Sequence, residues 1–286
     1  MRCRRNAKTW SLALGFLFVL LSAGTPCADE LPFRAKRIPG PLPLDPYHES
    51  WKQAPVVQIE LIPQAITTPS IFEAKIQKLY ARALHNGEEI AFLLEWEDET
   101  RDVVVDIDRY SDAAAVMFPS HETPGEEVVA PFTMGDGENP VNIWFWKASW
   151  QEKVEAPRIY YAPDPLHRPL RPEKGETEGF RGGVLAGNPV SGTRRTPVAN
   201  AIARGFGTLT ELHPEKTEFS IDGLGKWQAK RWAVTVKRSL AGHSELEAGF
   251  KAGEASHIAF AVWNGSENQR GARKVFSIWY DLTVEK

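Results

Sequence analysis

The pattern that most constrains the fold is a series of short apolar runs separated by turn residues. The runs are rich in β-branched and aromatic side chains, and turns such as Asn86-Gly87 lie between them. Such runs are typical of sandwich strands, because a helix needs a longer segment with a period of about 3.6 residues. The chain has no βαβ alternation, G-x-G-x-x-G motif or P-loop, which argues against a nucleotide-binding α/β fold. The sequence therefore predicts an all-β sandwich with strands in Pro55–Leu61, Phe72–Leu84, Glu89–Trp96, Ala113–Phe118, Val141–Trp146, Trp232–Lys237, His257–Trp263 and Val275–Val284.

Residues 156–200 differ in character from the rest of the chain. Thirteen of these 45 residues are proline or glycine, and arginines and apolar side chains lie among them. A loop of this length in a compact domain is usually functional or disordered. We predict an extended insertion that docks on another protein; a merely flexible loop is the alternative.

The N-terminal segment has the form of a secretory signal. Basic residues at positions 2, 4, 5 and 8 precede the apolar run Ser11–Gly24, which suits a signal peptide and is short for a membrane span. We predict a signal peptide over residues 1–28 and an exported mature domain over residues 29–286. The pair Arg4-Arg5 leaves the twin-arginine route open beside the general one. No later segment has the length of a membrane span, so the mature chain is expected to be soluble.

Cysteine content and charge exclude several classes of function. Both cysteines, Cys3 and Cys27, lie in the predicted signal peptide. The mature chain therefore has no thiol for a disulfide, an iron–sulfur cluster, a Cys-based zinc site or covalent haem attachment. The formal charge of −3 argues against binding to nucleic acid, which needs a basic face.

Met134 is the first candidate ligand, because it stands at a glycine turn just before an aromatic-rich strand, VNIWFWKASW. A thioether is a soft ligand that suits haem iron and copper, and aromatic surroundings suit a buried porphyrin. Outside the initiator the only other methionine is Met117, in the run AAAVMFP. A turn residue can be aimed at iron without disturbing a strand, which favours Met134, with Met117 as the alternative.

Five segments, in this order, resemble the haem b-binding gamma subunits of periplasmic molybdenum enzymes in the dimethyl sulfoxide reductase superfamily. That group includes ethylbenzene dehydrogenase, selenate and chlorate reductases, dimethyl sulfide dehydrogenase and nitrite oxidoreductase. The segments are DPYHESWKQAPVVQIELIPQ (Asp45–Gln64), LHNGEEIAFLLEWEDETRD (Leu84–Asp102), SDAAAVMFP (Ser111–Pro119), MGDGENPVNIWFWKASW (Met134–Trp150) and IAFAVWNGSENQRGARKVFSIWYDL (Ile258–Leu282).

The resemblance implies an immunoglobulin-like antiparallel β-sandwich that holds one non-covalent haem b between a methionine and a lysine. Matched by motif, the methionine is Met134, and the lysine of the G-x-x-K-x-x-S-x-W segment is Lys274. A lysine amine binds iron only when it is neutral, so burial and the metal must depress its pKa.

Other residues are expected around this axial pair. Arg273 faces either water or a haem propionate, and Met117 lines the pocket or replaces Met134. His257, at the entry to IAFAVW, is the alternative to Lys274, since imidazole is the commoner haem ligand. Four tryptophans either border the porphyrin or belong to the core: Trp144, Trp146, Trp263 and Trp279.

The expected function is electron transfer without catalysis. The resemblance implies a periplasmic subunit that passes electrons between the iron–sulfur beta subunit of a molybdoenzyme, whose alpha subunit holds molybdopterin, and a soluble periplasmic cytochrome. The alternative is a secreted carbohydrate- or ligand-binding β-sandwich with tryptophans as its platform. A hydrolase is disfavoured, because the chain has no G-x-S-x-G motif and no cysteine nucleophile in its mature part.

Overall fold

The computed structural model describes residues 33–68, 70–121, 127–155, 196–212 and 221–286, with the side chains of 153–155 left out. The predicted signal peptide and residues 156–195 of the predicted insertion lie outside this part of the chain. Within it, no helix is both long enough and apolar enough to cross a membrane.

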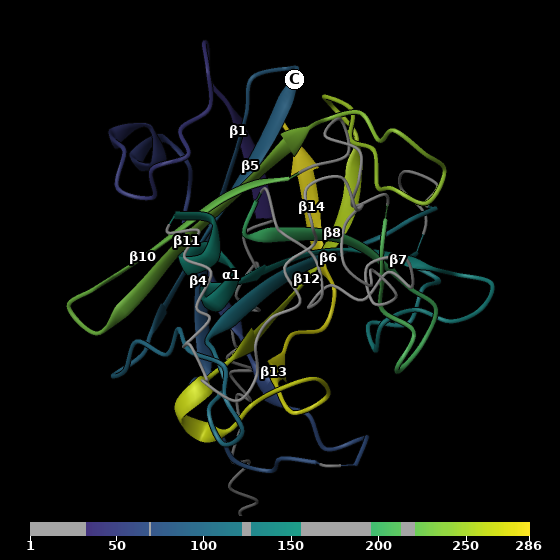
Figure 1. Ribbon diagram of the computed structural model, residues 1–286. Coiled ribbons are helices and arrows are strands. Elements are labelled where there is room, and N and C mark those ends of the chain that lie inside the picture. The colour runs from purple at the N-terminus through teal and green to yellow at the C-terminus, as the bar shows by residue number, and fades with distance from the viewer. Residues whose placement is uncertain (1–32, 69, 122–126, 156–195, 213–220) are drawn as a thin grey trace, which may run out of the picture. The chain divides into compact units, whose positions relative to one another are not determined.

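The described residues form β-strands with very little helix (Figure 1). One α-helix, α1 (Ala148–Glu155), follows the strand β7, and two 3-10 segments cover Glu49–Gln53 and Gly265–Glu267. The predicted all-β class is therefore confirmed. The strands are β1 (Phe33–Arg37), β2 (Val57–Glu60), β3 (Ile62–Pro63), β4 (Lys78–His85), β5 (Glu89–Glu97), β6 (Ala113–Pro119), β7 (Val141–Lys147), β8 (Val198–Ala203), β9 (Thr210–Glu211), β10 (Asp222–Gln228), β11 (Arg231–Ser239), β12 (Ala255–Trp263), β13 (Val275–Phe276) and β14 (Tyr280–Val284).

A continuous path of hydrogen-bonded strands joins two sheets in the order β10-β11-β5-β4-β1-β14-β12-β6-β7-β8-β9. The strand β12 passes from one sheet to the other, because Ala255–Ile258 pair with β14 and Ala259–Trp263 pair with β6. Pairing is antiparallel apart from β1, which runs parallel to both β4 and β14. A strand that switches sheets in this way lets the two sheets face each other.

The main core lies between the two sheets and is rich in aromatic rings. Phe92 of β5 packs against Phe118 of β6 at 5.5 Å between ring centroids and against Trp144 of β7 at 5.7 Å. Trp146 of β7 packs edge-on against Trp232 of β11 at 5.1 Å. These contacts join alternate side chains of facing strands, as sandwich packing requires.

Both faces of the second sheet are buried. Every residue of β6 is buried, although strands with one wet face alternate between buried and exposed. Ala114, Val116 and Phe118 face the inter-sheet core, whereas Ala113, Ala115 and Met117 belong to a second apolar cluster on the other face. Val128, Phe132, Met134 and Trp279, which lie outside the strands, pack against this second cluster.

The structure moves some of the predicted boundaries. The strand β4 begins at Lys78 rather than Phe72. The predicted strand Val275–Val284 is divided into β13 and β14. Between them, the Ser277 hydroxyl accepts the hydrogen bond of Phe260 N in place of a backbone carbonyl, which interrupts the regular ladder. The predicted insertion ends earlier than expected, since residues 198–200 already belong to the buried strand β8.

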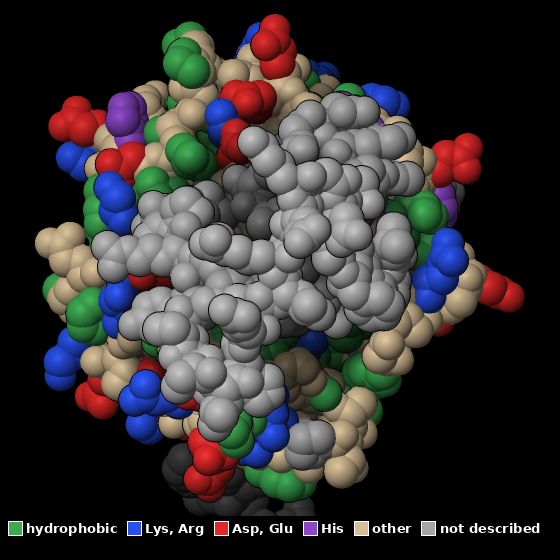
Figure 2. Space-filling model, in the orientation of Figure 1, with side chains coloured by type: hydrophobic (Ala, Val, Ile, Leu, Met, Phe, Trp, Pro, Cys, Tyr) green, Lys and Arg blue, Asp and Glu red, His purple; other side chains and the backbone are tan. Residues whose placement is uncertain are grey.

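Charged side chains of both signs lie interspersed around the edge of the face in Figure 2, where the described residues are visible. This mixed distribution agrees with the small formal charge of −3.

Candidate functional site

A cavity of about 540 Å³ lies on the outer face of β6, β7 and β12, away from the inter-sheet core. Its volume falls within the range of about 300–1,000 Å³ that is usual for cofactor and small-molecule sites. The register of the three strands arranges its floor in rows. The rows are Trp263–Ala113–Lys147, Ala261–Ala115–Phe145 and Ala259–Met117–Ile143.

Alanines form the middle of this floor. Ala113, Ala115, Ala259 and Ala261 lie on adjacent strands, and larger side chains stand at the borders. Alanine is a poor strand former, so its repetition here is explained by space rather than by propensity. Side chains of one carbon leave a flat floor with room above it for a planar ligand.

A strained turn brings Met134 to the cavity. Met134 has a φ of 83°, which is unfavourable for a residue with a side chain and costs of order 1–3 kcal/mol. Hydrogen bonds hold the turn, since Gly135 N donates to Pro131 O at 2.8 Å and Gly205 N donates to Met134 O at 2.9 Å. A side chain at position 135 would lie 2.6 Å from the Asn139 carbonyl oxygen, so only glycine fits there. Strain of this kind is typical of functional positions.

Lys274, which lies near the C-terminus of the chain, lines the same cavity. Its carbonyl oxygen accepts a hydrogen bond from Gln64 N at 3.0 Å, which fixes the backbone just before β13. The residue is only 8 % exposed, and its ammonium lies 5.2 Å from the centroid of the Trp263 ring. Burial lowers the pKa of Lys274 from its ordinary value of 10.5 to about 8.

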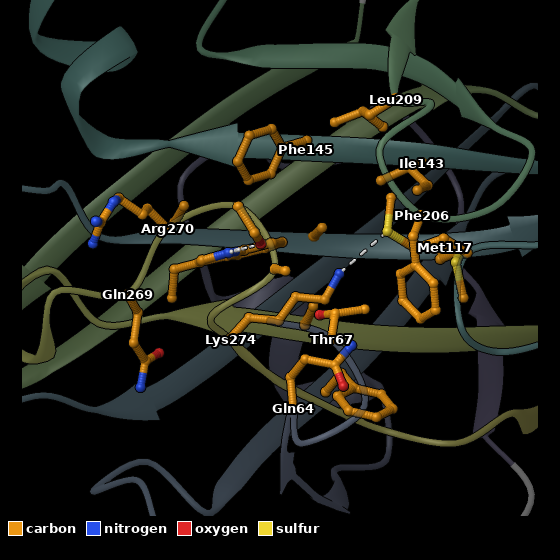
Figure 3. A pocket seen from close by; sticks show the side chains of 18 of the residues that line it. Gln64, Thr67, Met117, Ile143, Phe145, Phe206, Leu209, Gln269, Arg270 and Lys274 are labelled. Carbon is orange, nitrogen blue, oxygen red and sulfur yellow. Dashed lines mark hydrogen bonds between the residues drawn. The ribbon is translucent and has the colours of Figure 1, made fainter. Parts of the chain in front are cut away.

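The Lys274 amine points directly at the Met134 thioether (Figure 3). Its Nζ donates to Sδ at 3.6 Å, although the two residues are 140 positions apart. A thioether is a weak hydrogen-bond acceptor, so this hydrogen bond alone does not offset the free-energy cost of burying the amine. Both groups carry a lone pair that suits a transition metal, the amine once it is neutral.

The electrostatics of the cavity are one-sided. Among the described residues, three cations line it and no aspartate or glutamate does. The cations are Lys147, Arg270 and Lys274, and most of the remaining lining is apolar or aromatic. Such a cavity favours a flat, largely apolar ligand that carries negative charge.

Residues 48–275 match the sequence model of the ethylbenzene dehydrogenase family, which is most of the chain. The chain belongs to this family. The match covers the turn of Met134 and the whole floor of the cavity, and it includes Lys274. The resemblance inferred from the five sequence segments is thus confirmed.

Three relatives align over most of their length. A protein of Haloferax mediterranei described as a respiratory nitrate reductase heme subunit is 27 % identical, with 92 % of this chain and 78 % of the relative covered. The chlorate reductase subunit gamma of Ideonella dechloratans is 28 % identical, with coverages of 81 % and 76 %. The dimethylsulfide dehydrogenase subunit gamma of Rhodovulum sulfidophilum is 26 % identical, with coverages of 82 % and 73 %.

Among solved structures, the chain is similar to carbohydrate-binding domains at a low level. A family 9 carbohydrate-binding module of Caldicellulosiruptor kristjanssonii covers 88 % of this chain and 95 % of its own, at 8 % identity and a TM-score of 0.40. A carbohydrate-binding protein of Bacteroides uniformis reaches a TM-score of 0.47, also at 8 % identity, with coverages of 88 % and 98 %. Similarity this low carries no information about function.

In this member of the ethylbenzene dehydrogenase family, the structure brings together only some of the predicted site residues. Met134, Lys274 and Met117 line one cavity, and Trp263 borders it. Trp144 and Trp146 do not line it, because strand alternation turns them into the inter-sheet core and leaves Phe145 facing the cavity. Arg273 is also absent from the lining, and its neighbour Arg270 takes the place at the cavity edge.

The alternative ligands lie elsewhere among the described residues. His257 pairs with Asp281 at 3.4 Å and is not part of the cavity lining, whose described residues include no histidine. Met117 lies in the floor row of Ala259 and Ile143, whereas the Lys274 amine donates to the Met134 thioether. The Met134 thioether therefore has the position that the Lys274 amine faces.

Several lining residues were not predicted from the sequence, and Phe145, Lys147 and Arg270 are among them. For β7, strand alternation could have predicted two of them, since Ile143, Phe145 and Lys147 share one face of the strand, and Met117 lies opposite Ile143. For Arg270 no sequence pattern separates it from Arg273, because the fold of the turn decides which arginine reaches the cavity.

Proposed function

We propose that this protein is the haem b-binding, non-catalytic electron-transfer subunit of a periplasmic molybdoenzyme. The observation that carries the proposal is the convergence of the Met134 thioether and the Lys274 amine at 3.6 Å over an apolar floor. The names of the relatives support it, since one is a heme subunit and two are gamma subunits of a reductase and a dehydrogenase.

The residues of the cavity fit a non-covalent haem b. Met134 would hold the iron through a soft sulfur ligand, which tends to raise a reduction potential, and Lys274 would hold it through its neutral amine. Burial already favours the neutral amine that ligation requires, because the pKa of Lys274 is lowered to about 8 without any metal. The alanine floor leaves space for a planar macrocycle. When bound, the haem supplies a one-electron couple, and the chain holds it in a dry, aromatic setting.

We further propose the partners and the compartment that the resemblance implies. The subunit receives or delivers electrons through the iron–sulfur beta subunit beside the molybdopterin-bearing alpha subunit, and exchanges them with a soluble periplasmic cytochrome. The predicted signal peptide, residues 1–28, would direct the chain to the periplasm. The predicted insertion, residues 156–200, stays our candidate for a docking arm, and its residues 156–195 lie outside the described part of the chain.

The alternative of a carbohydrate-binding module has less support. A sugar platform needs exposed aromatic faces, but each tryptophan in the described residues is buried or half-buried. The described lining also presents cations and no carboxylate, although a neutral sugar carries no charge that would pair with them.

The test is an absorption spectrum of the protein purified from the periplasm, oxidised and then reduced with dithionite, together with a pyridine haemochrome assay. We expect a low-spin b-type spectrum at about one haem per chain. A folded protein without a Soret band, both alone and in its complex with partner subunits, would contradict the proposal.

A further inference from the structure

The cavity is polar at one end and apolar at the other. At one end of the floor lies the row of Trp263, Ala113 and Lys147, and at the other end the row of Met117, Ala259 and Ile143. Figure 3 shows Arg270 and Gln269 at the end opposite Met117, with the Lys274 amine between the two ends. A ligand that fits must therefore be charged along one edge and apolar along the opposite edge.

Arg270 is held at the charged end. Its guanidinium stacks on the Tyr110 ring at 4.2 Å, and its Nη1 donates to the Asn268 carbonyl oxygen at 3.1 Å. These contacts position the planar group and engage only part of it, because a guanidinium has five N–H donors. Arginine is the side chain that binds a carboxylate through two parallel hydrogen bonds.

Lys147 adds a second positive charge at this end. It lies opposite Ala113 on β7, in the same row as Trp263, and its ammonium is 5.9 Å from the centroid of the Trp150 ring. Lys274 cannot provide a positive charge at this end, because its amine is buried and points to Met134. Arg270 and Lys147 thus both belong to the described lining at this end of the cavity.

We propose that Arg270, assisted by Lys147, binds the carboxylate edge of the ligand, which for haem b is the edge of the two propionates. The inference rests on the proposed function and adds the orientation of the cofactor. The propionate edge lies toward Arg270 and Tyr110, and the apolar edge lies toward Met117 and Ile143. Arg270 acts as a positioning residue and leaves the axial pair unchanged. The prediction that Arg273 meets a propionate is replaced, because Arg273 does not line the cavity.

Haem and its dimethyl ester test this orientation, since the ester blocks both carboxylates and keeps the macrocycle and the iron. Each is titrated into the full chain freed of haem, and the affinity ratio is measured from the Soret band. We expect the unchanged protein to prefer free-acid haem roughly tenfold, the effect of about one charge-assisted contact. Arg270→Gln should bring the ratio close to one and keep the low-spin spectrum, and Lys147→Gln should reduce it less.

Arg204→Gln is the matched control. Arg204 is an exposed arginine near the cavity-lining Phe206, and it does not line the cavity, so the variant removes the same charge nearby and should keep the full ratio. A ratio that survives Arg270→Gln, or that disappears in Arg273→Gln instead, would overturn the inference. Equal affinity of the unchanged protein for both compounds would overturn it too and leave the proposed function standing. Binding of neither compound would reject the proposed function, and the inference with it.

Discussion

Two side chains at the residue scale are hard to explain by stability alone. Met134 has a left-handed backbone conformation, and Lys274 is a buried amine in a cavity whose described lining lacks a carboxylate. Each feature costs free energy in the protein without a ligand. Their meeting at one point suggests that the cost is offset when the cavity is filled.

The methionines give the first prediction. Met134→Ala should abolish the low-spin spectrum of the haem-loaded protein, because the sulfur facing Lys274 is lost. Met117→Ala should keep the low-spin spectrum and lower haem affinity only through lost packing in the floor. Absorption spectra of both variants decide between them. A low-spin spectrum that persists in Met134→Ala and vanishes in Met117→Ala would reassign the ligand.

Lys274 gives a prediction about pH for the protein without haem. In the unfolded chain the amine keeps a pKa near 10.5, whereas burial lowers the folded pKa to about 8. Below pH 8 both states hold the proton, and the full cost of burying the charge is present. Between pH 8 and pH 10.5 the folded state loses the proton first, so the stability of the haem-free protein should rise.

Lys274→Met provides the comparison, because it keeps a long unbranched side chain and removes the charge. Below pH 8 the variant should be more stable than the unchanged haem-free protein by about 3 kcal/mol, and the difference should shrink toward pH 10.5. Urea unfolding at a series of pH values measures this difference. A difference that does not vary with pH would mean that the amine is not buried as a cation.

At the scale of elements, glycines decide where β10 can pack. The strand carries Gly223 and Gly225, and a Cβ at position 225 would lie 2.3 Å from Cζ2 of Trp146. The backbone of Gly225 also exchanges hydrogen bonds with the buried Gln151 side chain, at 2.6 and 2.7 Å. The glycines thus let a strand approach a core tryptophan that a side chain would push away.

Gly225→Ala should therefore destabilise the protein by about 1–3 kcal/mol through overpacking against Trp146. Gly137→Ala is the control, because a Cβ there meets no atom within 4 Å and its backbone is not left-handed. The control should be neutral or slightly stabilising. Denaturant midpoints of the two variants test this, and equal midpoints would show that Trp146 can move aside.

At the scale of the whole domain, buried carboxylates tie the two sheets together at opposite ends of β11. At one end, Asp112 accepts hydrogen bonds from Trp232 Nε1 at 2.9 Å and from Gly265 N at 2.9 Å. At the other end, Arg238 pairs with Glu247 at 2.7 Å and lies 4.8 Å from the Trp144 ring of the facing sheet. The packing of the sandwich therefore depends on polar groups as well as on its aromatic core.

The Arg238–Glu247 pair gives the prediction at this scale. Glu247→Ala should cost about 3–5 kcal/mol, because it leaves a guanidinium buried without its counter-charge. The double variant Arg238→Met with Glu247→Leu should recover much of this loss, since apolar groups replace both charges. Equilibrium unfolding in urea measures both. A double variant as unstable as the single one would show that shape, rather than charge, is what this pair provides.

The sequence by itself determined the all-β class, the positions of most long strands and Met134 as a candidate ligand, and the resemblance to the family added Lys274. It could do so because strand alternation, turn residues and motif spacing are local properties of the chain. It offered Trp144 and Trp146 as candidates beside the cofactor and could not separate this position from the core, because composition does not say which face of a strand loops will cover. It overlooked β10, because glycines fit a strand only once the approach of Trp146 is known.

Only the tertiary structure decided the rest of the site. The cavity floor depends on the register of three strands, and the contact between Met134 and Lys274 joins residues 140 positions apart. The choice of Arg270 over Arg273 depends on the path of a single turn. These features follow from contacts between distant segments, and such contacts form only when the sheets pack and bring both segments to the same face.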